Sequence, residues 1–256
     1  LRILNGSNSR MFRLAWSDGS PLRILGTDGG LLDSPLSVPD IMLGPAERID
    51  LWADFGDMSA GSEVSLQSLS FNPGGGHMGM MGQRTALPHG APYELTRFRV
   101  SAAGQGRTSP PEQLASLSAL DPADAANANN PRQFYLSMNR MQPTINGRTF
   151  SMSEVAPDEM VRFGETEIWE FINTGGMMAL PHPMHIHGLS FQVLWRSGGT
   201  GYRFADQGWK DSVMVMPGER VALIMRFTDY KGLYLYHCHN LEHEDLGMMR
   251  NYLIRS

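Results

Sequence analysis

Short runs of alternating or apolar residues, separated by glycine, proline and asparagine, make up most of this chain. Strands of such length between turn residues are typical of β-sandwiches and β-barrels. No amphipathic stretch longer than about two turns favours a helix. The pattern therefore predicts an all-β fold, with the clearest early strands over residues 21–25, 48–55, 63–69 and 94–100.

Residues 102–131 interrupt this pattern. They are rich in alanine, serine, proline, asparagine and aspartate and contain few large apolar side chains, which is the composition of a linker. We expect two domains, 1–101 and 132–256. Pro217-Gly218-Glu219 predicts a turn that joins two later strands into a hairpin. The later strands are expected over residues 133–138, 161–163, 167–173, 189–195, 211–216, 221–227, 232–239 and 250–254.

Composition narrows the class of protein. A chain of 256 residues with 41% hydrophobic residues can bury a sizeable core, which excludes intrinsic disorder. The net charge of −5 leaves no basic surface for nucleic acid. No apolar run approaches the roughly 18 to 20 residues of a membrane span. Cys238 is the single cysteine, so no disulfide can form within the chain.

Histidine is clustered. Six of the eight histidines lie in two short segments, His-Pro-Met-His-Ile-His-Gly over 182–188 and His-Cys-His-Asn-Leu-Glu-His over 237–243, and Met248 follows the second. Chance placement would rarely group them this way. Imidazole, thiolate and thioether are metal ligands, so the two segments predict metal binding.

The two-residue period of a strand sorts these ligands. His237 and His239 project from one face, and Cys238 projects from the other. By the same rule His182 points away from His185, toward the side of Cys238. A turn after the strand can return the chain over the cysteine face. Two separate centres are therefore predicted, one of His182, Cys238, His243 and Met248 and one of His185, His187, His237 and His239.

The chemistry of each set favours copper. Two imidazoles, a thiolate and a weak thioether form a blue-copper ligand set, whereas structural zinc prefers a closed Cys/His shell without methionine. The second set is all imidazole, which suits copper that binds dioxygen. Because Cys238 is covalently flanked by His237 and His239, the strand is a short conduit for electrons from the first centre to the second.

Both histidine segments resemble signatures of the multicopper oxidases, which include laccases, bilirubin oxidases and cuprous oxidases. Residues 1–55 resemble the middle domain of the three-domain members, so the resemblance implies cupredoxin-like Greek-key β-sandwiches or barrels. It implies a type 1 copper in domain 132–256 and divides the other set between a type 2 copper and a binuclear type 3 pair. The implied ligands are His182, Cys238, His243 and Met248 for type 1, His185 for type 2, and His187, His237 and His239 for type 3.

One departure from the family pattern concerns the trinuclear cluster. The family builds it from four His-x-His pairs, but only two pairs occur here and none lies in residues 1–180. The resemblance thus implies a partner, an N-terminal polypeptide or domain that supplies the remaining histidines. We expect this chain to be the C-terminal portion of a cleaved, split or truncated four-copper oxidase, with domain 1–101 incomplete at its N-terminus. An extracytoplasmic location is implied by the resemblance alone.

Two acidic residues have open interpretations. Glu244 directly follows His243, and in the resembling oxidases an acid at this place is implicated in delivering protons to reduced oxygen. The alternative is a surface carboxylate paired with a cation. Asp211 either holds a cluster imidazole in its tautomer or is buried for structural reasons at a strand start.

Two histidines lie outside the metal motifs. His77 stands beside Met78, Met80 and Met81 in a glycine-rich segment, which indicates either a soft-metal site for Cu(I) or a plain connection. His89 is expected to be a solvated loop residue.

The donor sets together with the resemblance predict an oxidase that couples one-electron oxidation of a phenolic or aromatic reductant, or of Cu(I), to reduction of dioxygen to water. Alternatives are an electron-transfer cupredoxin, a copper nitrite reductase, and a copper-binding fragment without turnover. An electron-transfer cupredoxin needs neither flanking histidine, and a nitrite reductase needs one. The pair His237 and His239 argues against both.

Overall fold

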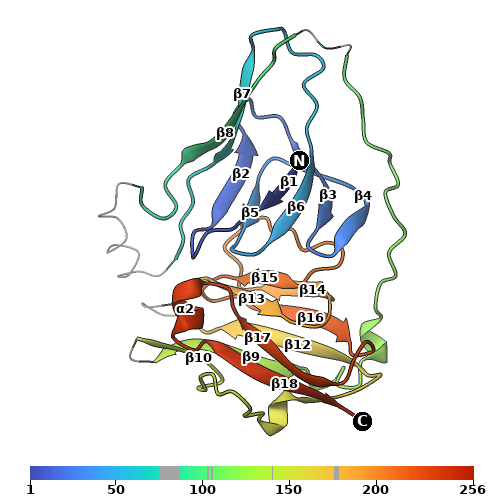
Figure 1. Cartoon of the computed structure of the whole chain (residues 1–256), viewed down its shortest axis with the longest axis vertical. Coiled ribbons are helices and arrows are strands. Elements are labelled where there is room, and N and C mark those ends of the chain that lie inside the picture. The colour runs from blue at the N-terminus through green and yellow to red at the C-terminus, as the bar shows by residue number, and fades with distance from the viewer. Residues whose placement is uncertain (75–86, 103, 105, 140, 176–178) are drawn as a thin grey trace.

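A computed structural model of the chain describes residues 1–74, 87–102, 104, 106–139, 141–175 and 179–256 (Figure 1). The all-β prediction is confirmed, because strands form four sheets and the described helices are short. These helices are η1 (Pro122–Asp124), η2 (Pro157–Glu159) and α2 (Leu241–Asp245). None of them has the length and apolar character needed to cross a bilayer.

The N-terminal half is a sandwich of two four-stranded sheets, in the orders β1-β6-β3-β4 and β5-β2-β7-β8. Alternate residues of β6 are buried, as expected for a strand with one face on a core. Leu14, Ile24, Leu51 and Leu66 are among the residues that form this core. The strands are β1 (Arg2–Leu4), β2 (Phe12–Trp16), β3 (Leu22–Thr27), β4 (Gly30–Val38), β5 (Ile41–Leu43), β6 (Arg48–Trp52), β7 (Glu63–Ser68) and β8 (Tyr93–Arg99).

The C-terminal half is a second sandwich, of two five-stranded sheets in the orders β10-β9-β12-β16-β14 and β11-β18-β17-β13-β15. Aromatic side chains such as Phe134, Trp169 and Tyr236 fill the space between its sheets. The strands are β9 (Arg132–Asn139), β10 (Gln142–Ile145), β11 (Met160–Arg162), β12 (Thr166–Asn173), β13 (His182–Ile186), β14 (Phe191–Ser197), β15 (Ser212–Val215), β16 (Arg220–Arg226), β17 (Gly232–Cys238) and β18 (Met249–Arg255).

The segment between the two sandwiches runs along one side of the molecule, drawn in green in Figure 1. Its last part is packed rather than free. Leu120, Ala125 and Ala128 contact Ile168 and Ile224 on the outer face of β12 and β16. This contact helps to explain why β12 and β16 are buried on both faces.

The predicted hairpin around Pro217-Gly218-Glu219 is wrong. β15 and β16 lie in different sheets, so the turn carries the chain from one layer of the sandwich to the other. The turn is held against the end of β12, because Gly218 donates its N–H to the carbonyl of Asn173. All four residues of β15 are buried, and this two-sided burial distinguishes it from a half-exposed hairpin strand.

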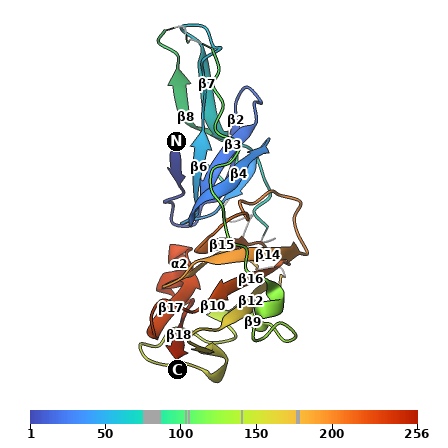
Figure 2. The same ribbon diagram turned by 90° about the vertical axis from the view of Figure 1, so that its right-hand side faces the viewer.

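β15 is the edge strand that faces the N-terminal half (Figures 1 and 2). Val213 and Val215 point into the core of their own sandwich. On the other face Met214, and beyond the strand Met216, pack in a cluster with Met11 and Met42 of the N-terminal half. The contact between the halves therefore covers a sheet edge that would otherwise be open.

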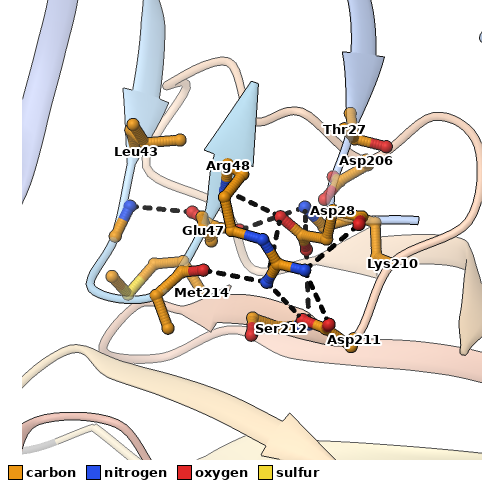
Figure 3. Close-up of polar contacts among 12 residues, drawn as sticks. Thr27, Asp28, Leu43, Glu47, Arg48, Asp206, Lys210, Asp211, Ser212 and Met214 are labelled. Atoms are coloured by element: carbon orange, nitrogen blue, oxygen red, sulfur yellow. Dashed lines mark hydrogen bonds and ion pairs between the residues drawn. The ribbon is translucent and has the colours of Figure 1, made fainter. Parts of the chain in front are cut away.

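A buried group of charges completes this contact (Figure 3). The Nζ atom of Lys210 is fully buried, 3.0 Å from Asp28 Oδ2 and 3.5 Å from Glu47 Oε1. Burial disfavours the charged ammonium, but the two carboxylates more than offset this effect and raise the pKa of Lys210. Both carboxylates come from the N-terminal half, so the lysine joins the two halves by charge.

Lys210→Met should lower the free energy of unfolding by about 3–5 kcal/mol, because it leaves two buried carboxylates without their cation. Urea unfolding followed by tryptophan fluorescence measures this. Lys231→Met is the control, since Lys231 is exposed and donates only to Ser256 Oγ among the described side chains; its change should stay within about 0.5 kcal/mol. Equal effects of the two substitutions would contradict the role given to Lys210.

Candidate metal centres

The first group of metal-ligating side chains lies on the core side of β17. β13 and β17 are antiparallel neighbours, with Met184 opposite Cys238 and His185 opposite His237. The Sγ atom of Cys238 is 3.5 Å from His182 Nδ1 and 3.7 Å from His243 Nδ1. All three side chains are buried. Strand pairing thus supplies His182, and the segment after β17 supplies His243.

These distances suit one ion held in common. With metal–sulfur bonds of about 2.3 Å and metal–nitrogen bonds of about 2.0–2.1 Å, a sulfur and a nitrogen on one ion lie roughly 3.5–3.8 Å apart. Burial raises the pKa of the Cys238 thiol to about 12 and lowers the pKa of His243 to about 4. Burial also lowers the pKa of His182. The imidazoles are neutral, and a cation is needed for Cys238 to be a thiolate in this setting.

Met248 returns to this group through a short helix. α2 begins directly after Asn240 and carries His243. Met248 then donates its N–H to the carbonyl of His243, and Cys238 donates its N–H to the carbonyl of Met248. The Met248 side chain is fully buried in the same core cluster as Cys238. The chain therefore places a thioether within the surroundings of the cysteine.

The second group lies on the opposite face of β17. His187 Nε2 is 3.1 Å from His237 Nε2, about the separation of two nitrogens bound to one ion. The ring of His185 lies 4.8 Å from that of His187 and 5.4 Å from that of His237. His239 is more peripheral, with its ring 5.2 Å from His237 and 5.7 Å from His185. The structure thus brings all four imidazoles together.

Main-chain carbonyls determine which ring nitrogen of His185 and of His237 keeps a lone pair. His185 Nδ1 lies 2.8 Å from the carbonyl oxygen of Asp211, and His237 Nδ1 lies 3.2 Å from that of Cys238. A carbonyl can only accept, so the neutral rings carry their proton on Nδ1. Nε2 of each ring therefore keeps its lone pair for a metal.

Comparison with known proteins now bears on this arrangement. The family model described as multicopper oxidase matches residues 125–256. The chain is 31% identical to the bilirubin oxidase of Albifimbria verrucaria over 97% of its own length and 43% of that protein. It is 30% identical to the laccase of Bacillus subtilis (strain 168) over 97% of its length and 49% of that protein.

This chain belongs to the multicopper oxidases. The crystal structure of the multicopper oxidase McoA from Aquifex aeolicus superposes with a TM-score of 0.83 at 35% identity, covering 100% of this chain and 55% of that one. The chain spans about half the length of the relatives it matches. Copper is the metal of the family, and the Cys/His and all-His donor sets described above suit it.

Glu244 of this multicopper oxidase chain lies beside the second group. Its Oε2 is 3.4 Å from His237 Nδ1, and its side chain is 29% exposed. No arginine or lysine among the described residues pairs with it. The carboxylate therefore stands between a histidine of the second group and solvent, which is a suitable position for moving a proton.

A cavity of about 400 Å³ opens beside the second group. His185 and His239 line it together with Asn5, Gly6 and Arg48 of the N-terminal half. The strand pattern did not predict these three residues as part of the site. The Asn5-Gly6-Ser7 stretch is typical of a turn, but only the contact between the halves brings this turn close to the histidines.

Two further predictions have different outcomes. His89 is not a solvated loop residue; it is half-buried, and its Nε2 accepts the N–H of Met11. Burial lowers its pKa to about 4, which keeps the ring neutral for this bond. The segment with His77 and Met78–Met81 lies outside the described residues, so the Cu(I) interpretation stays a prediction.

Cys238→Ser should abolish the intense blue absorption of the copper-loaded chain, since that colour comes from charge transfer between thiolate sulfur and Cu(II). Visible spectra at equal bound copper measure the change. His187→Gln is the matched control, because it removes an imidazole from the opposite face and should leave the colour intact. A serine variant that stayed blue would contradict the ligand role of Cys238.

Proposed function

We propose that this chain is the reductant-oxidising part of a multicopper oxidase that reduces dioxygen to two waters with four electrons and four protons. The observation that carries the proposal is the placement of two donor sets on opposite faces of β17. Cys238 faces His182 and His243, and its two neighbours in sequence face the other histidines. When bound, copper would supply the one-electron steps and the binding of dioxygen.

The first set is proposed to hold a type 1 copper, with Met248 as the weak axial ligand. A buried thiolate, two neutral imidazoles and a thioether are the ligands such a copper requires. Cys238 is covalently joined to His237 and His239, so its main chain gives electrons a direct route between the two sets. The reductant is proposed to be a phenolic or aromatic compound, or Cu(I).

The second set is proposed to contribute to a trinuclear cluster, with His185 on the type 2 copper and the other three histidines on the type 3 pair. Two further His-x-His pairs would be needed, and we propose that an N-terminal domain or polypeptide supplies them. The cavity beside His185 and His239 supports this partner, because it leaves room next to both rings. An extracytoplasmic location is proposed from the resemblance only.

A pure electron-transfer cupredoxin is the second candidate, and one geometric fact disfavours it. Such a protein has no use for imidazoles on the far side of the cysteine strand. Here His187 Nε2 and His237 Nε2 lie 3.1 Å apart with His185 beside them, and the three imidazoles are close enough to share one ion.

Dioxygen uptake with reductant tests the proposal. The copper-loaded chain alone should turn over roughly a hundredfold or more slower than the chain supplied with a polypeptide bearing two further His-x-His pairs, because missing ligands cost more than the 10–100-fold of an outer-shell change. The control is the same polypeptide with its histidines replaced by glutamine. Four-electron reduction by the chain alone, free of other polypeptide, would contradict the incomplete cluster.

Glu244→Gln should slow dioxygen reduction about 10²–10⁴-fold, because the amide keeps the shape of the side chain but cannot deliver a proton. Reduction of the type 1 copper should proceed normally. Stopped-flow measurement of the two half-reactions separates these effects. Glu242→Gln, on the same helix, is the control and should leave both rates unchanged. Equal slowing of both half-reactions by Glu244→Gln would indicate structural damage instead.

A further inference from the structure

We propose that Arg48, from the N-terminal half, is a positioning residue for His185 and acts through Asp211. The inference rests on the proposed function, since it treats His185 as a metal ligand. It adds that the ligand is oriented by the neighbouring domain rather than by its own sandwich alone.

The guanidinium of Arg48 makes two parallel bonds to the Asp211 carboxylate (Figure 3). Nη1 lies 2.6 Å from Oδ1, and Nη2 lies 2.7 Å from Oδ2. The guanidinium is fixed on its own side as well, because it donates to the carbonyls of Ala46 and Asp28. A planar donor fork with both ends anchored allows the carboxylate one orientation.

Asp211 transmits this orientation to the imidazole. Its main-chain carbonyl accepts from His185 Nδ1 at 2.8 Å and from the Ile186 N–H at 3.1 Å. Its carboxylate, drawn toward Arg48, lies farther from the ring, with Oδ1 3.5 Å from His185 Nδ1. Ser212 Oγ bridges the two, 2.9 Å from Asp211 Oδ1 and 3.1 Å from His185 Nδ1. Arg48 thus leaves the carbonyl as the principal acceptor for His185.

The residues around Asp211 are held by the same half. Asp28 accepts the Ser212 N–H at 3.3 Å and pairs with Lys210. Before them, Gly29 donates its N–H to the carbonyl of Trp209 at 2.7 Å. A Cβ atom on Gly29 would lie 2.4 Å from that of Trp209, so only glycine permits this approach. The segment that orients His185 is therefore docked on the N-terminal half along its length.

A comparable ion pair at the same contact lacks this connection. Arg13 Nε is 2.9 Å and Nη2 is 3.2 Å from the two oxygens of Asp40, which also accepts from Arg203 of the C-terminal half. In the described part of the chain, neither Arg13 nor Asp40 is hydrogen-bonded to a histidine. Arg13→Met therefore removes a similar two-bond pair within the N-terminal half, beside the Arg203 contact, and tests whether the loss of such a pair alone has the same effect.

Imidazole ¹⁵N–¹H spectra of the metal-free chain give the first test, with the His185 signal assigned from His185→Gln. The wild-type chain should show a protected Nδ1–H on His185. In Arg48→Met this proton should exchange with solvent about tenfold faster, because its acceptor is no longer held. Arg13→Met should match the wild type. Should Arg48→Met not fold, Asp211→Asn carries the same expectation.

Cu(II) binding gives the second test, followed by the non-blue electron paramagnetic resonance signal. Arg48→Met should weaken this site about 10–100-fold and leave the blue absorption unchanged. Unchanged exchange and affinity in the variants, or equal changes in Arg13→Met, would overturn the positioning role. A wild-type chain that binds no such copper would count against the proposed function instead, while the exchange measurement would still decide the role of Arg48.

Discussion

The alternation of side chains along β17 is the constraint on which the rest of this structure depends. Cys238 points into the apolar core, where burial favours a neutral thiol and neutral imidazoles. Of its two neighbours, His239 lines the cavity shared with the N-terminal half, and His237 is buried among the other imidazoles. One strand therefore separates a thiolate-containing donor set from an all-imidazole set by the thickness of its own backbone. Two donor sets with different chemistry can stand side by side because alternate residues of the strand face opposite sides.

The contact between the N-terminal and C-terminal halves is the second constraint on the structure. β15 has a partner on one side only, and the methionine cluster and the buried charges cover its other face. The same strand is paired with β13, which carries His182 and His185. Packing between the halves and the geometry of the histidines are consequently linked through a single strand. The ion pair of Arg48 with Asp211, just before that strand, is a polar part of the same contact.

Local pattern was enough for part of this picture. The strand period predicted that His182 and Cys238 share one side and that His185 lies on the other, since both facts depend on residues a few positions apart. Sequence could not predict that Pro217-Gly218-Glu219 joins two layers, because one face of β15 owes its burial to Met11 and Met42, far away in the chain. Sequence also could not assign Arg48 to the site, because its partner Asp211 lies 163 positions later in the chain.

The buried edge of β15 also bears on how separable the two sandwiches are. A C-terminal sandwich cut away from its neighbour would expose Met214 and Met216 at its edge strand and leave the Ser212 N–H without Asp28, which favours association with other chains. The N-terminal sandwich would keep Asp28 and Glu47 without Lys210. Each sandwich thus depends on the other to cover its apolar and charged surface. Joining either one to a different domain would require a redesign of the surface between them.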